Sequence, residues 1–198
     1  MTAEFCTSAR RRVCLPAGAL LFALTGAATA AELLEVSIEQ QGERYLMESR
    51  TLLAAPRPAV FRVLSDYDRF ERISSIFEDV RFIEPARDGT PRAYTLVKGC
   101  VLVFCKTIER IERLEFSPPD RIVAEVEPEH SDFRYGRTEW RFVPTDAGTE
   151  VLYRMEMEPG FWVPPVIGPY IMKRSFRKDA VEALDRIEAL AQGREPDS

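Results

Sequence analysis

Apolar and polar residues alternate strictly in two segments near the C-terminus, residues 138–143 and 151–158. The apolar positions of one face are Trp140 and Phe142 in the first segment and Val151, Tyr153, Met155 and Met157 in the second. A period of two is typical of strands with one buried and one solvated face. Because the turn-forming residues 144–149 separate the two segments, we expect a β-hairpin here.

A long amphipathic helix is predicted after this hairpin. Gly168 and Pro169 suit its first positions, and Gly193 suits its C-terminal cap. Apolar residues then recur at spacings of three and four, at Met172, Phe176, Ala180, Ala183, Leu184, Ile187 and Leu190. We expect this stripe to pack on a sheet. Two interpretations stay open: the helix closes an ordinary core, or it also covers a ligand cavity.

Two aromatic residues, Phe161 and Trp162, lie between prolines just before this helix. The prolines keep the loop stiff and exclude regular structure, and tryptophan favours a boundary between apolar and wet surroundings. We interpret the loop as the rim of a ligand entrance that also makes transient contact with a membrane. The alternative is that both rings plug the end of the core.

The remainder of the chain predicts an antiparallel α+β domain. Strand-like composition covers residues 33–53, 79–84, 94–116 and 121–127. The first of these is broken at residues 40–42, and two short helices are expected over residues 60–67 and 70–77. The order is therefore a strand, two short helices, about six strands and a long helix. Strands segregated from helices in this way indicate an antiparallel sheet.

The first thirty residues predict an export signal. Three arginines at 10–12 precede an apolar stretch, 13–25, and small residues at 28–30 form a cleavage site before Ala31. We therefore expect a periplasmic or secreted protein with one domain over residues 31–192 and a tail over residues 193–198. The alternative is an uncleaved membrane anchor, because residues 13–31 carry no charge and approach the roughly 20 residues that a span needs.

Without residues 1–30 the chain has 24 basic and 31 acidic residues, a net charge of −7. This acidity argues against nucleic acid, and against an anionic membrane as the primary partner. The remaining length suits one domain that buries about 70% of its unfolded surface. The sequence does not indicate an oligomeric state.

Two cysteines, Cys100 and Cys105, remain after cleavage. With a tight turn or a bulge between them, their Cα atoms reach the roughly 5.5 Å separation of a disulfide. We expect a structural disulfide, with two free buried thiols as the alternative. A redox role is disfavoured because the spacing is not Cys-x-x-Cys.

Two segments carry a resemblance to a known family. Residues 55–70, APRPAVFRVLSDYDRF, resemble the segment after the first strand of START-like proteins. Residues 138–144, TEWRFVP, are similar to a strand of the coenzyme Q-binding and polyketide cyclase/dehydrase-like branch. The resemblance covers about residues 33–191. The export signal and the cysteine pair depart from the mitochondrial quinone-binding members.

The resemblance implies a helix-grip fold: a curved antiparallel sheet of about six or seven strands wrapped on the C-terminal helix, with a hydrophobic tunnel between them. It also implies a lipid, a quinone or a polyketide as the ligand. We expect the ligand cavity to be lined by Tyr94, Trp140, Phe142, Tyr153, Met155, Met157, Phe161, Trp162, Ile171 and Phe176.

Catalytic motifs are scarce. His130 is the single histidine and lies in a turn-like stretch, where we expect it to be solvated. One histidine cannot supply a usual zinc site, so we expect neither a metal nor another cofactor. Three functions stay open: an exported binder or carrier of a hydrophobic molecule, a cyclase or dehydratase, and a structural domain whose tunnel is filled. A pocket with a buried Arg, Tyr or Glu would favour the enzyme.

Overall fold

A single antiparallel sheet dominates the structure. The computed structural model describes residues 31–101, 104–163 and 168–196, except for the side chains of residues 99–101, 104–106, 168–172, 175, 176 and 178. The strands are β1 (Glu32–Gln41), β2 (Arg44–Leu53), β3 (Phe77–Ile83), β4 (Arg92–Val101), β5 (Phe104–Ser117), β6 (Arg121–Val126), β7 (Phe133–Thr145) and β8 (Gly148–Pro159). The helices are α1 (Arg57–Ser65) and α2 (Gly168–Ala191), with short 3₁₀ helices η1 (Tyr67–Arg72) and η2 (Pro128–His130).

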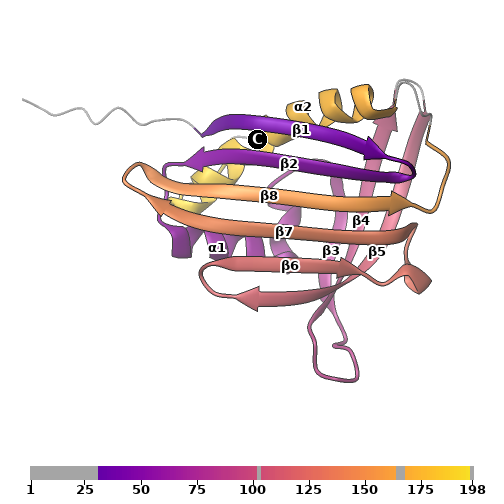
Figure 1. The fold of residues 1–198 in the computed structure, drawn as a ribbon. Coiled ribbons are helices and arrows are strands. Elements are labelled where there is room, and N and C mark those ends of the chain that lie inside the picture. The colour runs from indigo at the N-terminus through magenta and orange to yellow at the C-terminus, as the bar shows by residue number, and fades with distance from the viewer. Residues whose placement is uncertain (1–30, 102–103, 164–167, 197–198) are drawn as a thin grey trace, which may run out of the picture.

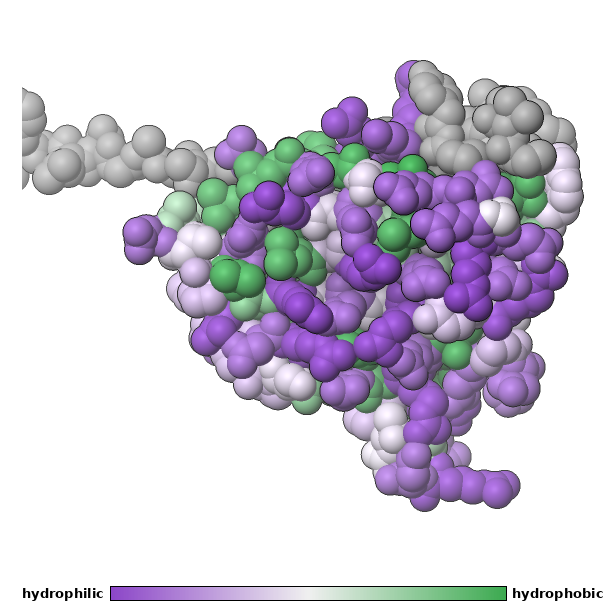
Figure 2. Space-filling view, viewed as in Figure 1, coloured by the Kyte–Doolittle hydropathy of each residue, from purple (hydrophilic) through white to green (hydrophobic). Residues whose placement is uncertain are grey.

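The strand order is β1-β2-β8-β7-β6-β5-β4-β3. The sheet curves so that α2 lies behind β1 and β2, on the same side as α1 (Figure 1). α2 packs against β1, β2 and α1. This is the predicted helix-grip arrangement, and the opposite, outer face of the sheet is mostly hydrophilic (Figure 2).

The described residues form eight strands, whereas about six or seven were predicted. The difference lies in residues 33–53, where the break at residues 40–42 is a hairpin turn between β1 and β2 rather than an interruption of one strand. Gly42 has φ +64°, a left-handed backbone that glycine adopts without steric cost. The register pairs Gln41 with Arg44 across this turn.

The second short helix also differs from its prediction. It is a 3₁₀ helix that ends at Arg72, and Phe77 is the first residue of β3. Apolar spacing alone could not separate these elements, because Phe70 and Ile73 are both buried in the same core as Phe77.

The long helix begins at Gly168 and ends at Ala191, as predicted, and Gly193 follows with φ +73°. Its C-terminal half is clamped to the link between β2 and α1. The backbone N–H of Ala54 donates to Glu188 Oε2 at 2.7 Å, and Gln192 Nε2 donates to the Ala54 carbonyl at 2.6 Å. The clamp fixes the position of α2 over the sheet.

The main core lies between the sheet and the two α-helices. Phe142 on β7 is 3% exposed, and its ring packs edge-on against Phe61 of α1 with centroids 5.8 Å apart. A smaller cluster around Tyr45, Phe133 and Met157 lies near the C-terminal end of β8, whereas Phe142 pairs with Val151 near the start of that strand. Ala31 and Ala191 both pack against the main core, so residues 31–191 contain every part of it that the structure describes.

No helix among the described residues is both long enough and apolar enough to cross a membrane. The predicted export signal, residues 1–30, lies outside the described residues.

Candidate functional site

At four positions on the inner face of the sheet the side chain is a small hydroxyl residue and not a bulky apolar one. Ser49 and Thr51 of β2, Thr95 of β4 and Thr138 of β7 are all buried. In each strand they occupy the alternate positions that point toward α2. Because these side chains are short, they do not fill the space under the helix. A cavity of about 210 Å³ remains between the sheet and α2.

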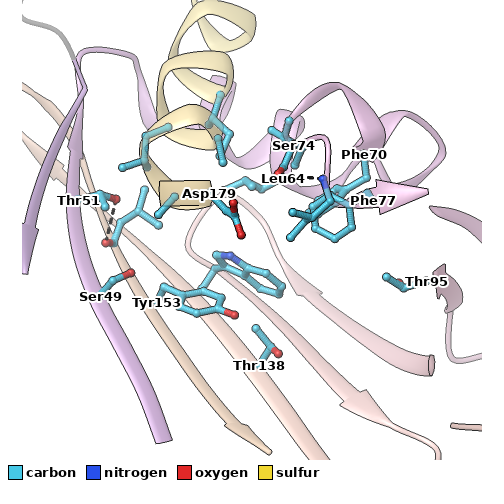
Figure 3. A pocket seen from close by; sticks show the side chains of 18 of the residues that line it. Ser49, Thr51, Leu64, Phe70, Ser74, Phe77, Thr95, Thr138, Tyr153 and Asp179 are labelled. Atoms are coloured by element: carbon cyan, nitrogen blue, oxygen red, sulfur yellow. Dashed lines mark hydrogen bonds between the residues drawn. The ribbon is translucent and has the colours of Figure 1, made fainter. Parts of the chain in front are cut away.

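Most of the cavity wall is apolar. The helix α2 contributes Ala180, Ala183, Leu184 and Ile187, and the segment from α1 to β3 contributes Leu64, Tyr67, Phe70, Ile73, Ile76 and Phe77. Figure 3 shows α2 above the cavity, Phe70 and Phe77 at its side, and Tyr153 and Thr138 on the strands below. Because the side chains of Ala180 and Ala183 are small, they leave space between α2 and the sheet.

One charged residue of β5, Arg110, forms part of the wall, and it is paired with Glu112 behind it. Arg110 lines the cavity and is 16% exposed, and Glu112 beside it is 2% exposed. Arg110 Nε lies 3.1 Å from Glu112 Oε2, an ion pair. The Thr95 hydroxyl donates to the same carboxylate oxygen at 3.2 Å. Removing two charges from water costs several kcal/mol per ion, which only good mutual geometry repays.

The ion pair leaves one donor unused. Arg110 Nε is close to the carboxylate, but its N–H lacks hydrogen-bond geometry toward any acceptor among the described residues. Leaving a buried donor unsatisfied costs about 1–3 kcal/mol.

Two tyrosines complete the polar part of the site. Burial raises the pKa of Tyr153 to about 12, with the nearby Glu112 charge adding to the effect and Arg110 opposing it. Burial also raises the pKa of Tyr67 well above its usual value, again with Glu112 adding and Arg110 opposing. Both phenols therefore stay protonated at neutral pH. The Tyr153 hydroxyl donates to Met155 Sδ at 3.1 Å, and a thioether is a weak acceptor that a ligand oxygen can replace.

Asp179 of α2 also lines the cavity. Its carboxylate points down from the helix toward the strands (Figure 3). Among the described side chains that line the cavity, the charged ones are Arg110 and Asp179, and the hydroxyls come from β2, β4, β7 and β8 and from the segment between α1 and β3. The arrangement can orient an oxygen-bearing apolar molecule and can donate hydrogen bonds to it.

Two of the predicted cavity residues lie in the wall. Trp140 and Tyr153 both line the cavity, and their rings are 5.5 Å apart. Phe142, two residues along β7, faces the same side but packs into the solid core against Phe61. Alternation therefore identified the face correctly for these side chains, whereas the cavity occupies only part of that face.

The other predicted residues on the strands lie away from the cavity. Met155 and Met157 belong to the small cluster with Tyr45 and Phe133, at the far end of β8. Tyr94 does not line the cavity, because its neighbours Ala93 and Thr95 are the buried, inward positions of β4. Its ring instead stacks under the Arg81 guanidinium, 4.5 Å from the ring centroid.

The two aromatic residues of the loop before α2 have different environments. Phe161 packs against Phe133 with ring centroids 6.2 Å apart, whereas Trp162 is 79% exposed. Both border a separate hollow with Tyr45, Arg134 and Val163. The side chains of the remaining predicted residues, Ile171, Phe176, Cys100 and Cys105, lie outside the described part of the chain.

Sequence reasoning missed Arg110, Glu112 and the hydroxyl residues. The hydroxyls of β2 could have been found from the sequence. Ser49 and Thr51 continue the series of alternate positions that starts with Tyr45 and Met47, so they belong to the same face of the strand. His130 is exposed, as expected. Among the side chains that the structure describes, no cluster of His, Cys, Asp and Glu has the makings of a metal site.

Solved structures share this fold at low sequence identity. A START superfamily protein from Mycobacterium smegmatis matches with a TM-score of 0.59 at 15% identity, over 73% of this chain and 98% of that one. The Zhui aromatase/cyclase from Streptomyces sp. R1128 matches with a TM-score of 0.57 at 18% identity, over 75% and 94%. A STAR-related lipid transfer protein from Xanthomonas axonopodis matches with a TM-score of 0.53 at 17% identity, over 79% and 98%.

No curated protein matches this sequence. A family model does match, over residues 53–185, and it is described as polyketide cyclase / dehydrase and lipid transport. The match runs from the last residue of β2 to the middle of α2, so it includes α1, η1 and most of the strands that enclose the cavity. The chain therefore belongs to the polyketide cyclase / dehydrase and lipid transport family.

Proposed function

We propose that this protein binds and carries a small hydrophobic molecule that bears at least one oxygen acceptor. The observation that supports this most strongly is the cavity between the sheet and α2, whose mostly apolar walls include the largely buried Arg110. Apolar pockets with a few placed polar groups are typical of sites for small organic ligands. The ligand would lie under α2, with its oxygen toward Arg110 and Tyr153.

The size of the cavity limits the ligand. A dry cavity of about 150 Å³ holds benzene, and the cavity here is about 210 Å³. One or two rings, or a short branched chain, fit such a volume. We therefore favour a polyketide-like molecule or the head of a quinone over an entire phospholipid, whose chains exceed this volume.

We infer from residues 1–30 that the carrier acts after export, in the periplasm or outside the cell. The alternative, an uncleaved anchor, would hold the same domain at a membrane surface. Sequencing the N-terminus of the protein isolated from its own cells distinguishes the two. A mature chain that begins at Ala31 supports export, and one that retains residues 13–30 contradicts it.

Filling the cavity tests the binding proposal. Ala183 lines the cavity, and Val181 lies two residues away on the same helix but is 51% exposed. We expect Ala183→Phe to abolish binding of a fluorescent naphthyl ketone, and Val181→Phe to leave it unchanged. Thermal unfolding of both variants establishes that the fold survives. Equal affinities for Ala183→Phe and the unmodified protein would overturn the proposed site.

A cyclase or dehydratase is the second candidate, and the buried Glu112 with the partly buried Arg110 and Tyr153 favours it. Burial and charge partners of this kind are often found at catalytic sites. Arg110 would stabilise a developing oxyanion, and a protonated Tyr153 would donate a proton. The test is the mass of a bound ligand before and after incubation. A carrier returns the ligand unchanged, whereas a dehydratase returns it lighter by one water molecule.

A further inference from the structure

The first half of α2 carries three exposed cations close together along the helix. Lys173, Arg174 and Arg177 are all exposed, and none of them forms an ion pair with a described side chain. Lys173 and Arg177 are four residues apart and Arg174 and Arg177 three apart, so the three share one face of the helix. Residues 173–178 contain four basic residues and no acidic one.

The outer face of the sheet shows the opposite pattern. There, basic residues are matched across neighbouring strands by carboxylates, as in the pairs Arg44–Glu156, Arg50–Glu150 and Arg154–Glu48. Such pairs leave little net field. The basic face of α2 is therefore a local positive site on a domain whose net charge is −7.

Local charge decides the interaction at short range. The Debye length at physiological ionic strength is about 8 Å, so acidic groups farther than this from the cations are largely screened. The net negative charge describes the domain as a whole, and it argues against binding to an anionic membrane only if the charge is spread evenly over the surface. Three unpaired cations on one helix face attract anionic lipid headgroups despite it.

An exposed aromatic residue lies close to the cations along the chain. Trp162 is 79% exposed, and α2 begins six residues later, within about 21 Å even for extended chain. Lys173 lies about 8 Å farther along the helix axis. Tryptophan favours the interface between headgroups and hydrocarbon, where its ring is partly buried and its N–H stays solvated.

We propose that the face formed by Lys173, Arg174 and Arg177, together with Trp162, docks on a bilayer that contains anionic lipids. Among the described side chains of α2, those that line the ligand cavity begin at Asp179, just beyond the cations. Docking through this face therefore holds the cavity next to the bilayer. Docking determines where the protein acts and does not depend on which ligand it binds.

Vesicle binding of residues 31–198, which contain every described helix and strand, tests this proposal. The vesicles are phosphatidylglycerol with phosphatidylcholine, or phosphatidylcholine alone. The test variant is Lys173→Gln/Arg174→Gln/Arg177→Gln. The matched control is Arg62→Gln/Arg87→Gln/Arg194→Gln, which removes the same charge from three exposed arginines elsewhere. A third variant is Trp162→Ser.

Each cation near an anionic surface contributes about fivefold in affinity, so the test variant should bind the anionic vesicles roughly a hundredfold more weakly at low salt. The control should stay within about twofold. Trp162→Ser should weaken binding while leaving its salt dependence unchanged. Binding of the naphthyl ketone should be the same in all three variants, which separates this proposal from the cavity proposal.

Several outcomes would overturn the docking proposal: equal binding to both kinds of vesicle, no vesicle binding at all, or an equal loss in the test and control variants. A single-stranded oligonucleotide at the same phosphate concentration provides the remaining comparison. If it binds more tightly than the anionic vesicles and loses affinity in the test variant, the face recognises nucleic acid and not a membrane.

Discussion

Removing the positive partner of the buried ion pair is the most informative single change. In Arg110→Met a side chain of similar length replaces the guanidinium, and Glu112 stays 2% exposed with only the Thr95 hydroxyl beside it. Breaking a buried pair from one side typically costs about 3–5 kcal/mol, because an uncompensated charge is left behind. For a domain of this size each kcal/mol corresponds to roughly 2–4 °C in Tm.

The second half of this experiment removes both charges. Replacing a buried ion pair by apolar residues of similar volume is often neutral or stabilising. We therefore expect Arg110→Met/Glu112→Met to recover most of the stability that Arg110→Met loses. Urea unfolding followed by tryptophan fluorescence measures the free energy of unfolding of all variants, and equal m-values show that the comparison is valid.

The expected result is a strong coupling between the two positions, with a stable double variant that no longer binds the naphthyl ketone tightly. Such a result would mean that the pair is retained for the ligand and not for stability. If Arg110→Met costs less than about 1 kcal/mol, or if the two single substitutions simply add, the pair is not a coupled buried ion pair and the reasoning fails.

Three further predictions concern other parts of the molecule. Phe142→Ala should cost about 3–5 kcal/mol of unfolding free energy and Trp140→Ala clearly less, because only Trp140 borders the cavity; equal losses in urea unfolding would contradict the cavity. Because burial raises the pKa of Tyr153 to about 12, its contribution to the free energy of unfolding should be intact below pH 10 and be lost between about pH 10 and 12. In Tyr153→Phe the free energy of unfolding should therefore fall less steeply with pH over the same range. An unchanged slope of unfolding free energy against pH would contradict the assignment. Since β4 and β5 pair Cys100 directly with Cys105, we predict a disulfide in the protein isolated from its own cells, and labelling of both thiols under denaturing, non-reducing conditions would exclude it.

The elements with an unbroken period were predictable from sequence. The hairpin of β7 and β8 and the helix α2 each bury one continuous face, so a period of two or of 3.6 residues appears directly in the residue order. The turn at Gly42 was harder, because residues 40–42 interrupt an apolar pattern without a proline and the strands on either side are both half-exposed.

The polar wall of the cavity was not predictable by the same means. β5 contains the sequence IERIERLEF over residues 108–116, in which charged residues fall on both faces. Periodicity assigns such carboxylates to solvent. Only the curvature of the sheet and the position of α2 show that Arg110 and Glu112 lie inside, whereas Arg113 pairs with Asp88 near the surface.

Alternation predicts which face of a strand a residue lies on, but it does not predict whether that part of the strand borders the cavity. Tyr153, Met155 and Met157 share one face, yet Tyr153 borders the cavity and the two methionines pack in a separate cluster. The cavity is shorter than β8, and its extent depends on where small residues such as Ser49 and Thr138 face α2.

Native mass spectrometry of the protein isolated from its own cells tests the central claim most directly. We expect a one-to-one complex with a small, oxygen-bearing apolar molecule, present in the unmodified protein and in Val181→Phe but absent from Ala183→Phe. An unmodified protein that carries no such molecule and takes none up from a cell extract, or a bound molecule that Ala183→Phe retains in full, would contradict it.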